Sequence, residues 1–329
     1  MSKSETMQIE NVQGSSTSSN ELLAPDKIII EEDEIIDVPQ FNNVWERIRH
    51  EYRAYFAEFL GTLILVAFGD GVVAQKKLSG GAAGSYTNVS MSWGFAVMMG
   101  FLVSGGISGG HMNPAVTLVA AAFRGFSWRK VPGYIFSQLL GGLIGAYVVY
   151  GTYYQSFDDY EGVGIRTVTG DTATAGIFCT FPAGDYLTTR GQVLSEFVSS
   201  VLLEIGIFAL SDACNVESAK HWFPIGLFFL IYGIGACFGY QTGYAINMAR
   251  DFAPRVAATS VGYGREMWTA GNGYAWVPVV MPIIGCFTGA IIYDAFIYQG
   301  QDSPLNKPYF GFGRFFGKGR QTKDVENQY

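Results

Sequence analysis

The chain has 329 residues, of which 49% are hydrophobic, 15% are charged and 42 are glycine. The formal net charge is −7, which excludes a strongly basic surface, so no nucleic-acid partner is expected. This balance is typical of a polytopic helical membrane protein rather than of a soluble domain of the same length. The four cysteines share no short metal-binding spacing, so we expect core residues or free thiols, and neither a metal nor a cofactor. They are Cys179, Cys214, Cys237 and Cys286.

Residues 1–43 are predicted to form a disordered, acidic tail. A segment rich in Ser, Thr and Asn (15–20) precedes an acidic block edged by isoleucines (28–36), and this composition buries too little apolar surface to fold. The alternative is a docking or gating segment for a regulatory partner, switched by phosphorylation nearby. The next run, 41–53, combines Trp45 with three arginines and indicates an interfacial anchor on the cytoplasmic side.

Residues 44–299 are predicted to form a membrane domain, followed by a C-terminal tail at 300–329. Six apolar runs are each near the roughly 20 residues that a helix needs to cross a bilayer. We expect these spans at 51–74, 87–107, 130–152, 190–211, 221–240 and 272–298. Most Lys and Arg residues between the spans fall on the side of the tails, so the positive-inside rule predicts that both termini are cytoplasmic.

Two polar, glycine-rich stretches, 109–117 and 242–250, lie between apolar runs, one in each half of the chain. Each has a glycine-bearing lead-in, then an Asn, which is a favoured helix N-cap, then a run that can begin a helix. Pro114 suits the first helical position, where its missing N–H costs nothing. The helices expected at 113–124 and 247–258 are too short to cross a bilayer. Because lipid does not tolerate free backbone groups, both stretches must line a cavity or be buried in protein.

The chain repeats itself in two halves, 51–152 and 190–298. The sequence AEF at 57–59 returns as SEF at 195–197, and the glycines at 141 and 145 return at 285 and 289. The paired glycines predict close helix packing. With three spans in each half, the second copy must be inverted in the membrane, a recurrent design in channels and transporters.

The pair of Asn-Pro-Ala-type turns, one in each half of a six-span protein, resembles the aquaporin (major intrinsic protein) family over about residues 54–298. The similarity includes His111 before the first turn and Arg250 and Asp251 after the second. The resemblance implies an all-α membrane protein with six transmembrane helices and two re-entrant half-helices in an inverted repeat. It also implies a homotetramer with one pore per subunit, and transport without catalysis.

The residues of the two turns are expected to control what passes. They are Asn113, Pro114, Ala115, Asn247, Met248 and Ala249. The half-helices would face each other with their N-termini, each carrying about half a positive elementary charge, and the Asn amides would donate to a passing hydroxyl group while cations and protons are repelled. A ladder of backbone acceptors would replace the hydration that the solute loses on entry. Its carbonyls belong to Gly109, Gly110, His111, Met112, Gly243, Tyr244, Ala245 and Ile246.

Glu58 and Glu196 are charged residues within apolar spans, which is costly unless they are paired or face inward. A proton relay is one hypothesis. The family resemblance favours the other, in which each carboxylate accepts backbone N–H groups from the re-entrant loop of its own half. The resemblance also implies that Asp251 braces the turn of its half-helix, and that His111 is a neutral pore-lining or loop-bracing residue rather than a pH-sensitive group.

The narrowest ring of the family maps, by spacing from the two Asn residues, onto Trp93, Gly235, Tyr244 and Arg250. This set resembles the glycerol-conducting, fungal-type branch: two aromatic rings form an apolar wedge for a carbon backbone, and the arginine fork donates to hydroxyl groups. Met248 departs from the family pattern, which has proline there. Its long, flexible side chain would narrow or soften the midpoint of the pore.

We therefore expect a passive channel for glycerol and other small uncharged polyols, with water also passing and protons and ions excluded. Its lipid bilayer is expected to be the plasma membrane. One alternative is a water-selective channel with a tightened or gated pore, against which Gly235 argues. The other is a non-conducting sensor whose acidic tail is the working part. The long connection at 153–189 is expected to fold over the outer vestibule.

Overall fold

The computed structural model describes residues 29–30, 34–35, 40–215 and 219–310, and the chain divides into two units, 1–48 and 49–329. In the first unit the two-residue strands β1 (Ile29–Ile30) and β2 (Glu34–Ile35) pair antiparallel. Helix α1 (Val44–Glu51) spans the boundary between the units. Up to residue 39, the rest of the predicted acidic tail lies outside the described residues, and so does the C-terminal tail beyond residue 310.

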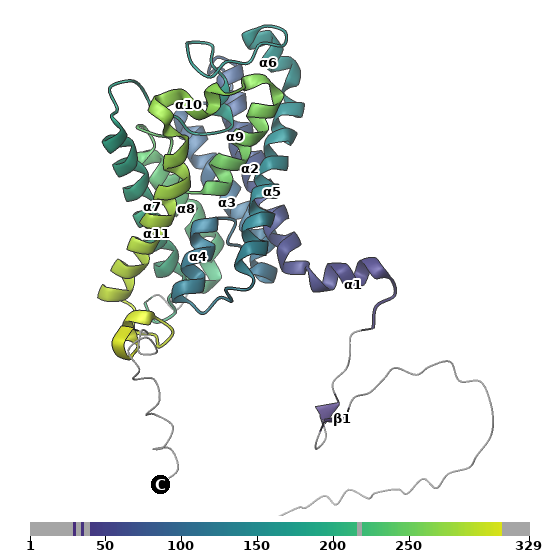
Figure 1. The fold of residues 1–329 in the computed structure, drawn as a ribbon, viewed down its shortest axis with the longest axis vertical. Helices are drawn as coiled ribbons and strands as arrows, with labels where there is room; N and C mark the ends of the chain where they lie inside the picture. The colour runs from purple at the N-terminus through teal and green to yellow at the C-terminus, as the bar shows by residue number, and fades with distance from the viewer. Residues whose placement is uncertain (1–28, 31–33, 36–39, 216–218, 311–329) are drawn as a thin grey trace, which may run out of the picture. The chain divides into compact units, whose positions relative to one another are not determined.

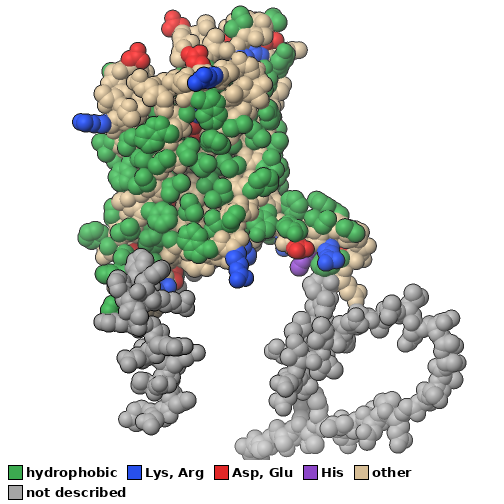
Figure 2. Space-filling model, in the orientation of Figure 1, with side chains coloured by type: hydrophobic (Ala, Val, Ile, Leu, Met, Phe, Trp, Pro, Cys, Tyr) green, Lys and Arg blue, Asp and Glu red, His purple; other side chains and the backbone are tan. Residues whose placement is uncertain are grey.

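The second unit is a bundle of six helical segments that are long and apolar enough to cross a membrane. They are α2 (Arg53–Leu78), α3 (Tyr86–Ser108), α5 (Val131–Thr152), α7 (Thr189–Ser211), α8 (Ala219–Phe238) and the kinked segment Glu266–Phe296. Figure 1 shows the long helices side by side, and Figure 2 shows hydrophobic side chains over the side of this bundle, with charged side chains toward its two ends. The predicted all-α membrane fold with six spans is confirmed.

The last span departs from its expected start at residue 272. Helix α10 (Glu266–Gly273) is interrupted near its end, where Gly271 and Asn272 have φ angles of 64° and 60°, a region that Gly and Asn tolerate best. A 3-10 turn, η3 (Tyr274–Trp276), follows, and the crossing helix α11 (Val277–Phe296) begins after it, with a proline in its first turn. The continuous span therefore starts later than its apolar run.

Two short helices, α4 (Pro114–Phe123) and α9 (Met248–Ala258), lie at the positions expected for the re-entrant half-helices. In Figure 1, α4 lies in the lower half of the bundle and α9 in the upper half. Helix α9 packs on α5, and α4 packs on α11, so the last span of each repeat supports the half-helix of the other repeat.

Glycines on α5 and α11 set the spacing of two equivalent helix pairs. A Cβ atom at Gly141 would lie 2.3 Å from the Phe59 carbonyl oxygen on α2, and one at Gly289 would lie 2.5 Å from the Val201 carbonyl oxygen on α7. Side chains do not approach a backbone so closely, so glycine is what permits these helices to pack at this distance. The same packed pair occurs in both halves, as the glycine repeat predicts.

The connection predicted at 153–189 is folded. It contains α6 (Tyr154–Glu161) and the 3-10 turn η1 (Ala175–Ile177). Phe157 and Phe178 are buried, and their rings stack with centroids 5.7 Å apart. This aromatic packing holds the loop in a defined conformation at the end of the bundle.

An ion pair ties the first part of this loop together. Arg166 Nη2 lies 2.8 Å from the Asp158 Oδ1 atom. The hydrogen bond from this guanidinium lowers the pKa of the Asp158 carboxyl. Because the pKa is lowered on folding, the contribution of the pair to stability is present above the usual carboxyl range and is lost as the pH falls through the lowered value.

Candidate functional site

Both half-helices are capped by the predicted asparagines. The Asn113 side-chain oxygen accepts a 3.0 Å hydrogen bond from the Ala115 N–H, and the Asn247 oxygen accepts a 2.9 Å hydrogen bond from the Ala249 N–H. Both asparagines have an extended backbone, which is the conformation of an N-cap. The caps hold the two helix N-termini in fixed positions within the bundle.

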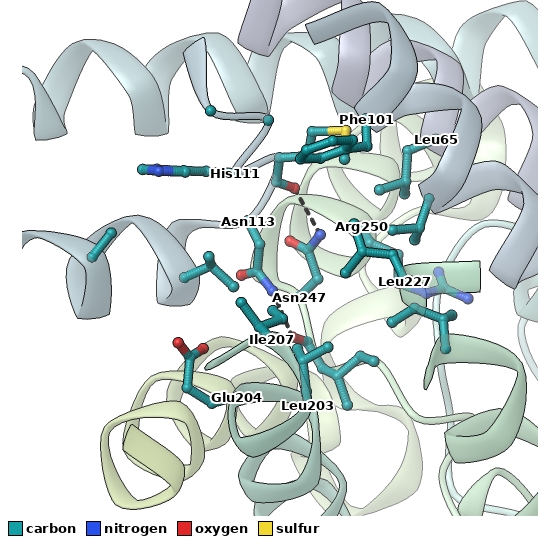
Figure 3. Close-up of a pocket in the computed structure, with 18 of the residues that line it drawn as sticks. Leu65, Phe101, His111, Asn113, Leu203, Glu204, Ile207, Leu227, Asn247 and Arg250 are labelled. Carbon is teal, nitrogen blue, oxygen red and sulfur yellow. Dashed lines mark hydrogen bonds between the residues drawn. The ribbon is translucent and has the colours of Figure 1, made fainter. Parts of the chain in front are cut away.

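The Asn amides also join the two re-entrant loops. Asn113 Nδ2 donates to the Ile246 carbonyl oxygen at 2.9 Å, and Asn247 Nδ2 donates to the Met112 carbonyl oxygen at 2.8 Å (Figure 3). A primary amide has two N–H donors, so each asparagine retains a second donor. The Met112 and Ile246 carbonyls, expected as free members of the ladder, each use one acceptor position in this cross-link.

Met248 takes the first helical position of α9, as Pro114 does in α4. Neither residue lines the cavity on which the two asparagines lie. The methionine therefore leaves the helix start in place, and its side chain is not among the residues that line this cavity.

Two cavities lie along the axis of the bundle and contain the predicted acceptor ladder. The inner cavity, of about 210 Å³, is lined by residues 109–113 and 244–247, and the outer cavity, of about 370 Å³, is lined in part by Gly243. All eight ladder residues thus border one cavity or the other. Their backbone is unusual: φ is 49° at Met112, 41° at Tyr244 and 45° at Ile246, a region that non-glycine residues rarely adopt.

The buried glutamates hold this backbone in place. Glu58 accepts hydrogen bonds of 2.9 and 2.7 Å from the N–H groups of the two residues before Asn113. Glu196 accepts equivalent bonds of 3.0 and 3.1 Å from the two residues before Asn247. Both carboxyl groups are fully buried. The bonds offset the cost of left-handed backbone at non-glycine positions, about 1–3 kcal/mol each, and they match the bracing geometry expected from the sequence.

Asp251 braces more than the turn of its own half-helix. It accepts from Arg255, four residues on, at 2.9 Å, and it also accepts from both the backbone N–H and the hydroxyl group of Thr180 at 2.6 Å. Arg255 is buried as well and donates to the Thr180 carbonyl oxygen at 2.7 Å. The group ties α9 to the outer loop. The sequence signal for this group is an Asp and an Arg four residues apart on one helix.

Three residues line both cavities and therefore form the boundary between them: Trp93, Tyr244 and Arg250. The fourth predicted ring member, Gly235, lines neither cavity. A Cβ atom there would lie 2.6 Å from the Tyr244 ring, so the glycine provides the space that this ring fills. The predicted ring is thus brought together, with Gly235 behind Tyr244 rather than facing the opening.

The Arg250 guanidinium is held from several sides. It stacks over the Trp93 ring, 3.9 Å from the ring centroid, and its Nη1 atom lies 3.4 Å from the Phe178 carbonyl oxygen. The same atom lies 3.9 Å from Oδ1 of Asp70, a fully buried residue of α2. Within the described residues, neither Asp70 carboxylate oxygen has a hydrogen-bond partner, so the arginine charge is its visible compensation. The sequence signal for this residue is a lone Asp within an apolar span.

The inner half contains His111 and Arg124. His111 Nδ1 lies 3.2 Å from the Thr117 hydroxyl oxygen, and Figure 3 shows the ring extending away from the Asn pair. Arg124 forms a two-pronged ion pair with Asp294, at 2.6 and 3.0 Å, and its guanidinium lies over the Phe208 ring. Both side chains are therefore held by protein groups at the cavity wall.

Metal ligands are not assembled in the part of the chain that the structure describes, where no group of three or more His, Cys, Asp or Glu residues is placed to hold an ion. The cysteines are all free thiols, two of them buried and two exposed.

Comparisons with known proteins agree with this geometry. Residues 45–293 match the family model of the major intrinsic proteins. The chain is 51% identical over 288 residues to a probable aquaglyceroporin-2 of Gibberella zeae, covering 87% of this chain and 84% of the relative. It is 50% identical to aquaglyceroporin-9 of Botryotinia fuckeliana, covering 87% of this chain but 62% of that longer relative.

A solved structure shares the fold. The X-ray structure of the aquaglyceroporin from Plasmodium falciparum aligns with a TM-score of 0.65 at 30% identity, covering 74% of this chain and 96% of that chain. Together with the capped half-helices, the paired glutamates and the six spans, these similarities establish that the chain belongs to the major intrinsic protein family.

Proposed function

We propose that the chain is a passive membrane channel for glycerol and other small uncharged polyols, through which water also passes and from which protons and ions are excluded. The observation that carries this proposal is the boundary between the two cavities, where two aromatic rings and one guanidinium meet. The relatives named aquaglyceroporins support the same solute class. The channel acts without catalysis.

Selection for polyols follows from the chemistry of this boundary. The Trp93 and Tyr244 side chains supply apolar surface for the carbon backbone of the solute, while the Arg250 fork donates to its hydroxyl groups. Gly235 leaves the ring without a further bulky polar side chain, which a water-selective opening would need. A strictly water-selective channel is the alternative, and the space that Gly235 gives to Tyr244 argues against it.

Exclusion of cations and protons follows from the two helix N-termini. Each end carries about half a positive elementary charge, and both point at the same midpoint, where the free donors of Asn113 and Asn247 bind a passing hydroxyl oxygen. A solute oxygen that accepts from both amides cannot also accept from the next water, so a chain of proton-conducting hydrogen bonds is interrupted. The braced carbonyls of the ladder replace the lost hydration step by step.

We also propose the setting of the channel: a homotetramer with one pore per subunit, in the plasma membrane, with both termini in the cytoplasm. The family supports the tetramer, and the basic residues at the tail end of the spans support the orientation. The channel domain is 44–299, and the N-terminal tail, 1–43, is the segment that binds a regulatory partner.

The passive mechanism is tested by glycerol entry into proteoliposomes under an imposed pH gradient or membrane potential. We expect the rate of entry to be the same with and without either gradient, and a pH-sensitive dye inside the vesicles to show no added proton leak. A glycerol rate that follows the gradient would contradict passive conduction and would indicate a driven transporter on the same fold.

A further inference from the structure

The wall of the inner cavity is chemically divided. The re-entrant loops form its polar side, with the acceptor ladder and the two asparagines. The full-length helices form the other side, with mainly apolar residues such as Leu65, Val97, Ile207, Leu227 and Ile231. A solute with all its hydroxyl groups on one edge fits such a cavity, because its carbon edge contacts the apolar side.

Glu204 interrupts the apolar side. It lies on α7 and is 1% exposed, and it lines the inner cavity (Figure 3). Its Oε2 atom has no hydrogen-bond partner among the described residues. Arg124, which also lines this cavity, forms its ion pair with Asp294. A buried carboxyl oxygen without a partner is costly, so its presence at a cavity wall requires an explanation.

The other buried glutamates show the contrast. Both oxygens of Glu58 and of Glu196 accept backbone N–H groups, which accounts for their burial. Among the described residues Glu204 makes no such bond to a re-entrant loop; its carboxyl group interacts with the Cys286 thiol and with the charge of Arg124. At the cavity wall, one carboxyl oxygen of Glu204 is therefore buried without a protein partner among the described residues.

We propose that Glu204 binds solute hydroxyl groups on the otherwise apolar wall and so determines specificity for longer polyols. This inference rests on the proposed polyol channel and extends it. The three hydroxyl groups of glycerol can all face the loop side. An acyclic polyol of four or five carbons carries hydroxyl groups on both edges, and each one that faces the apolar wall loses its hydration without replacement. Glu204 supplies the missing acceptor, so longer polyols gain more from it than glycerol does.

The test compares permeabilities in proteoliposomes by stopped-flow light scattering, with water, glycerol, erythritol and ribitol as the permeants. The variants are Glu204→Gln, which keeps an acceptor, and Glu204→Met, which keeps the length and removes it. The matched control is Ser199→Ala on the same helix. Ser199 is also buried and its hydroxyl lacks a partner among the described residues, but it lines neither cavity.

We expect Glu204→Met to lower the erythritol-to-glycerol and ribitol-to-glycerol permeability ratios by about fivefold, the size expected for one lost hydrogen bond. Glu204→Gln should keep most of each ratio, and Ser199→Ala should leave both unchanged. Water permeability should change by less than about twofold in every variant, because a water molecule can pass without an acceptor on the apolar wall.

Three results would overturn the inference. Unchanged polyol ratios in Glu204→Met would show that no solute uses this acceptor. An equal fall for every permeant, including water, would show that Glu204 supports the fold instead. A potassium leak in the wild-type protein that Glu204→Gln removes would show a cation site. If wild-type vesicles admit glycerol no faster than empty ones, the proposed function itself fails, which is a distinct outcome.

Discussion

At the scale of single residues, Arg250 contributes both to selection of solutes by charge and to selection by shape. Its guanidinium is stacked on Trp93 and lies 3.9 Å from the buried Asp70 carboxylate. The ion pair compensates the arginine charge while the remaining donors stay available at the boundary. The boundary therefore offers hydrogen-bond donors to an uncharged solute, while its local positive charge is too well compensated to attract anions strongly.

Asp70→Asn tests this compensation. The amide has nearly the same volume but no charge, so Arg250 keeps an uncompensated positive charge next to the opening. We expect anion permeability, measured with a chloride-sensitive dye in vesicles, to rise by about tenfold, equivalent to about 1.4 kcal/mol. Arg250→Ala is the comparison: it should admit larger uncharged solutes without favouring anions. Equal anion permeability in wild type and Asp70→Asn would contradict the role given to Asp70.

Met248→Pro tests the second departure at this scale. Because Met248 occupies the first helical position and does not line the inner cavity, proline should fit without altering the pore. We expect unchanged glycerol and water permeability and a gain in unfolding free energy of about 0.4–1 kcal/mol from the less flexible unfolded chain. A several-fold increase in glycerol permeability would mean that the methionine does narrow the midpoint.

At the scale of elements, the site depends on contacts that hold loops against helices. Asp251 and Arg255 on α9 together fix Thr180 of the outer loop through three hydrogen bonds, and an ion pair joins Asp251 to Arg255 within the same buried cluster. The next residues before Thr180 include Phe178, whose carbonyl oxygen meets Arg250. The outer loop is thereby connected to the boundary between the cavities.

Asp251→Asn removes the charge that compensates the buried Arg255. An unpaired buried charge costs about 3–5 kcal/mol, so we expect a clearly lower thermal unfolding midpoint in detergent and faster proteolysis within 153–189. Asp158→Asn is the matched control, because it breaks an ion pair of the same loop at a more exposed position. The control should lose less stability. Equal losses would argue against a special role for the Asp251 cluster.

The packing of α5 on α2 gives a prediction for the helix pairs. Gly141→Ala places a Cβ atom 2.3 Å from a carbonyl oxygen, so the helices must separate, and we expect a loss of about 1–3 kcal/mol. Gly151→Ala is the control on the same helix, since its Cβ atom would meet nothing within 4 Å. Thermal unfolding of both variants in detergent compares them. If Gly151→Ala lost as much stability as Gly141→Ala, the loss would come from helix α5 itself and not from its packing on α2.

Local sequence patterns predict much of this architecture, but they do not predict the contacts between residues that are far apart in the chain. The spans, the Asn caps and the glutamate braces follow from runs and motifs within one stretch of sequence or its repeat. The partnership of Asp251 with Thr180 joins residues 71 apart, and that of Asp70 with Arg250 joins two different halves. Such contacts depend on how the helices and loops pack against each other, and the periodicity of the sequence does not predict that packing. The sequence analysis placed the start of the last span at residue 272, whereas the left-handed backbone at Gly271 and Asn272 interrupts the helix there and delays α11.

At the scale of the whole channel domain, two equivalent halves each contribute three spans, one half-helix and one braced loop. Each half-helix rests on the last span of the other half, and each Asn amide bonds to the loop of the other half. The midpoint is therefore held by both halves at once. The inner cavity contains this midpoint and most of the acceptor ladder, and the boundary of Trp93, Tyr244 and Arg250 separates it from the outer cavity.

A glycerol path through this boundary is tested most directly by stopped-flow light scattering of proteoliposomes in a glycerol gradient, with sucrose as the control solute. We expect fast shrinkage as water leaves, then re-swelling well above the rate of empty vesicles as glycerol enters, and no re-swelling in sucrose. Fast shrinkage followed by re-swelling no faster than that of empty vesicles would contradict it and would identify a water-selective channel.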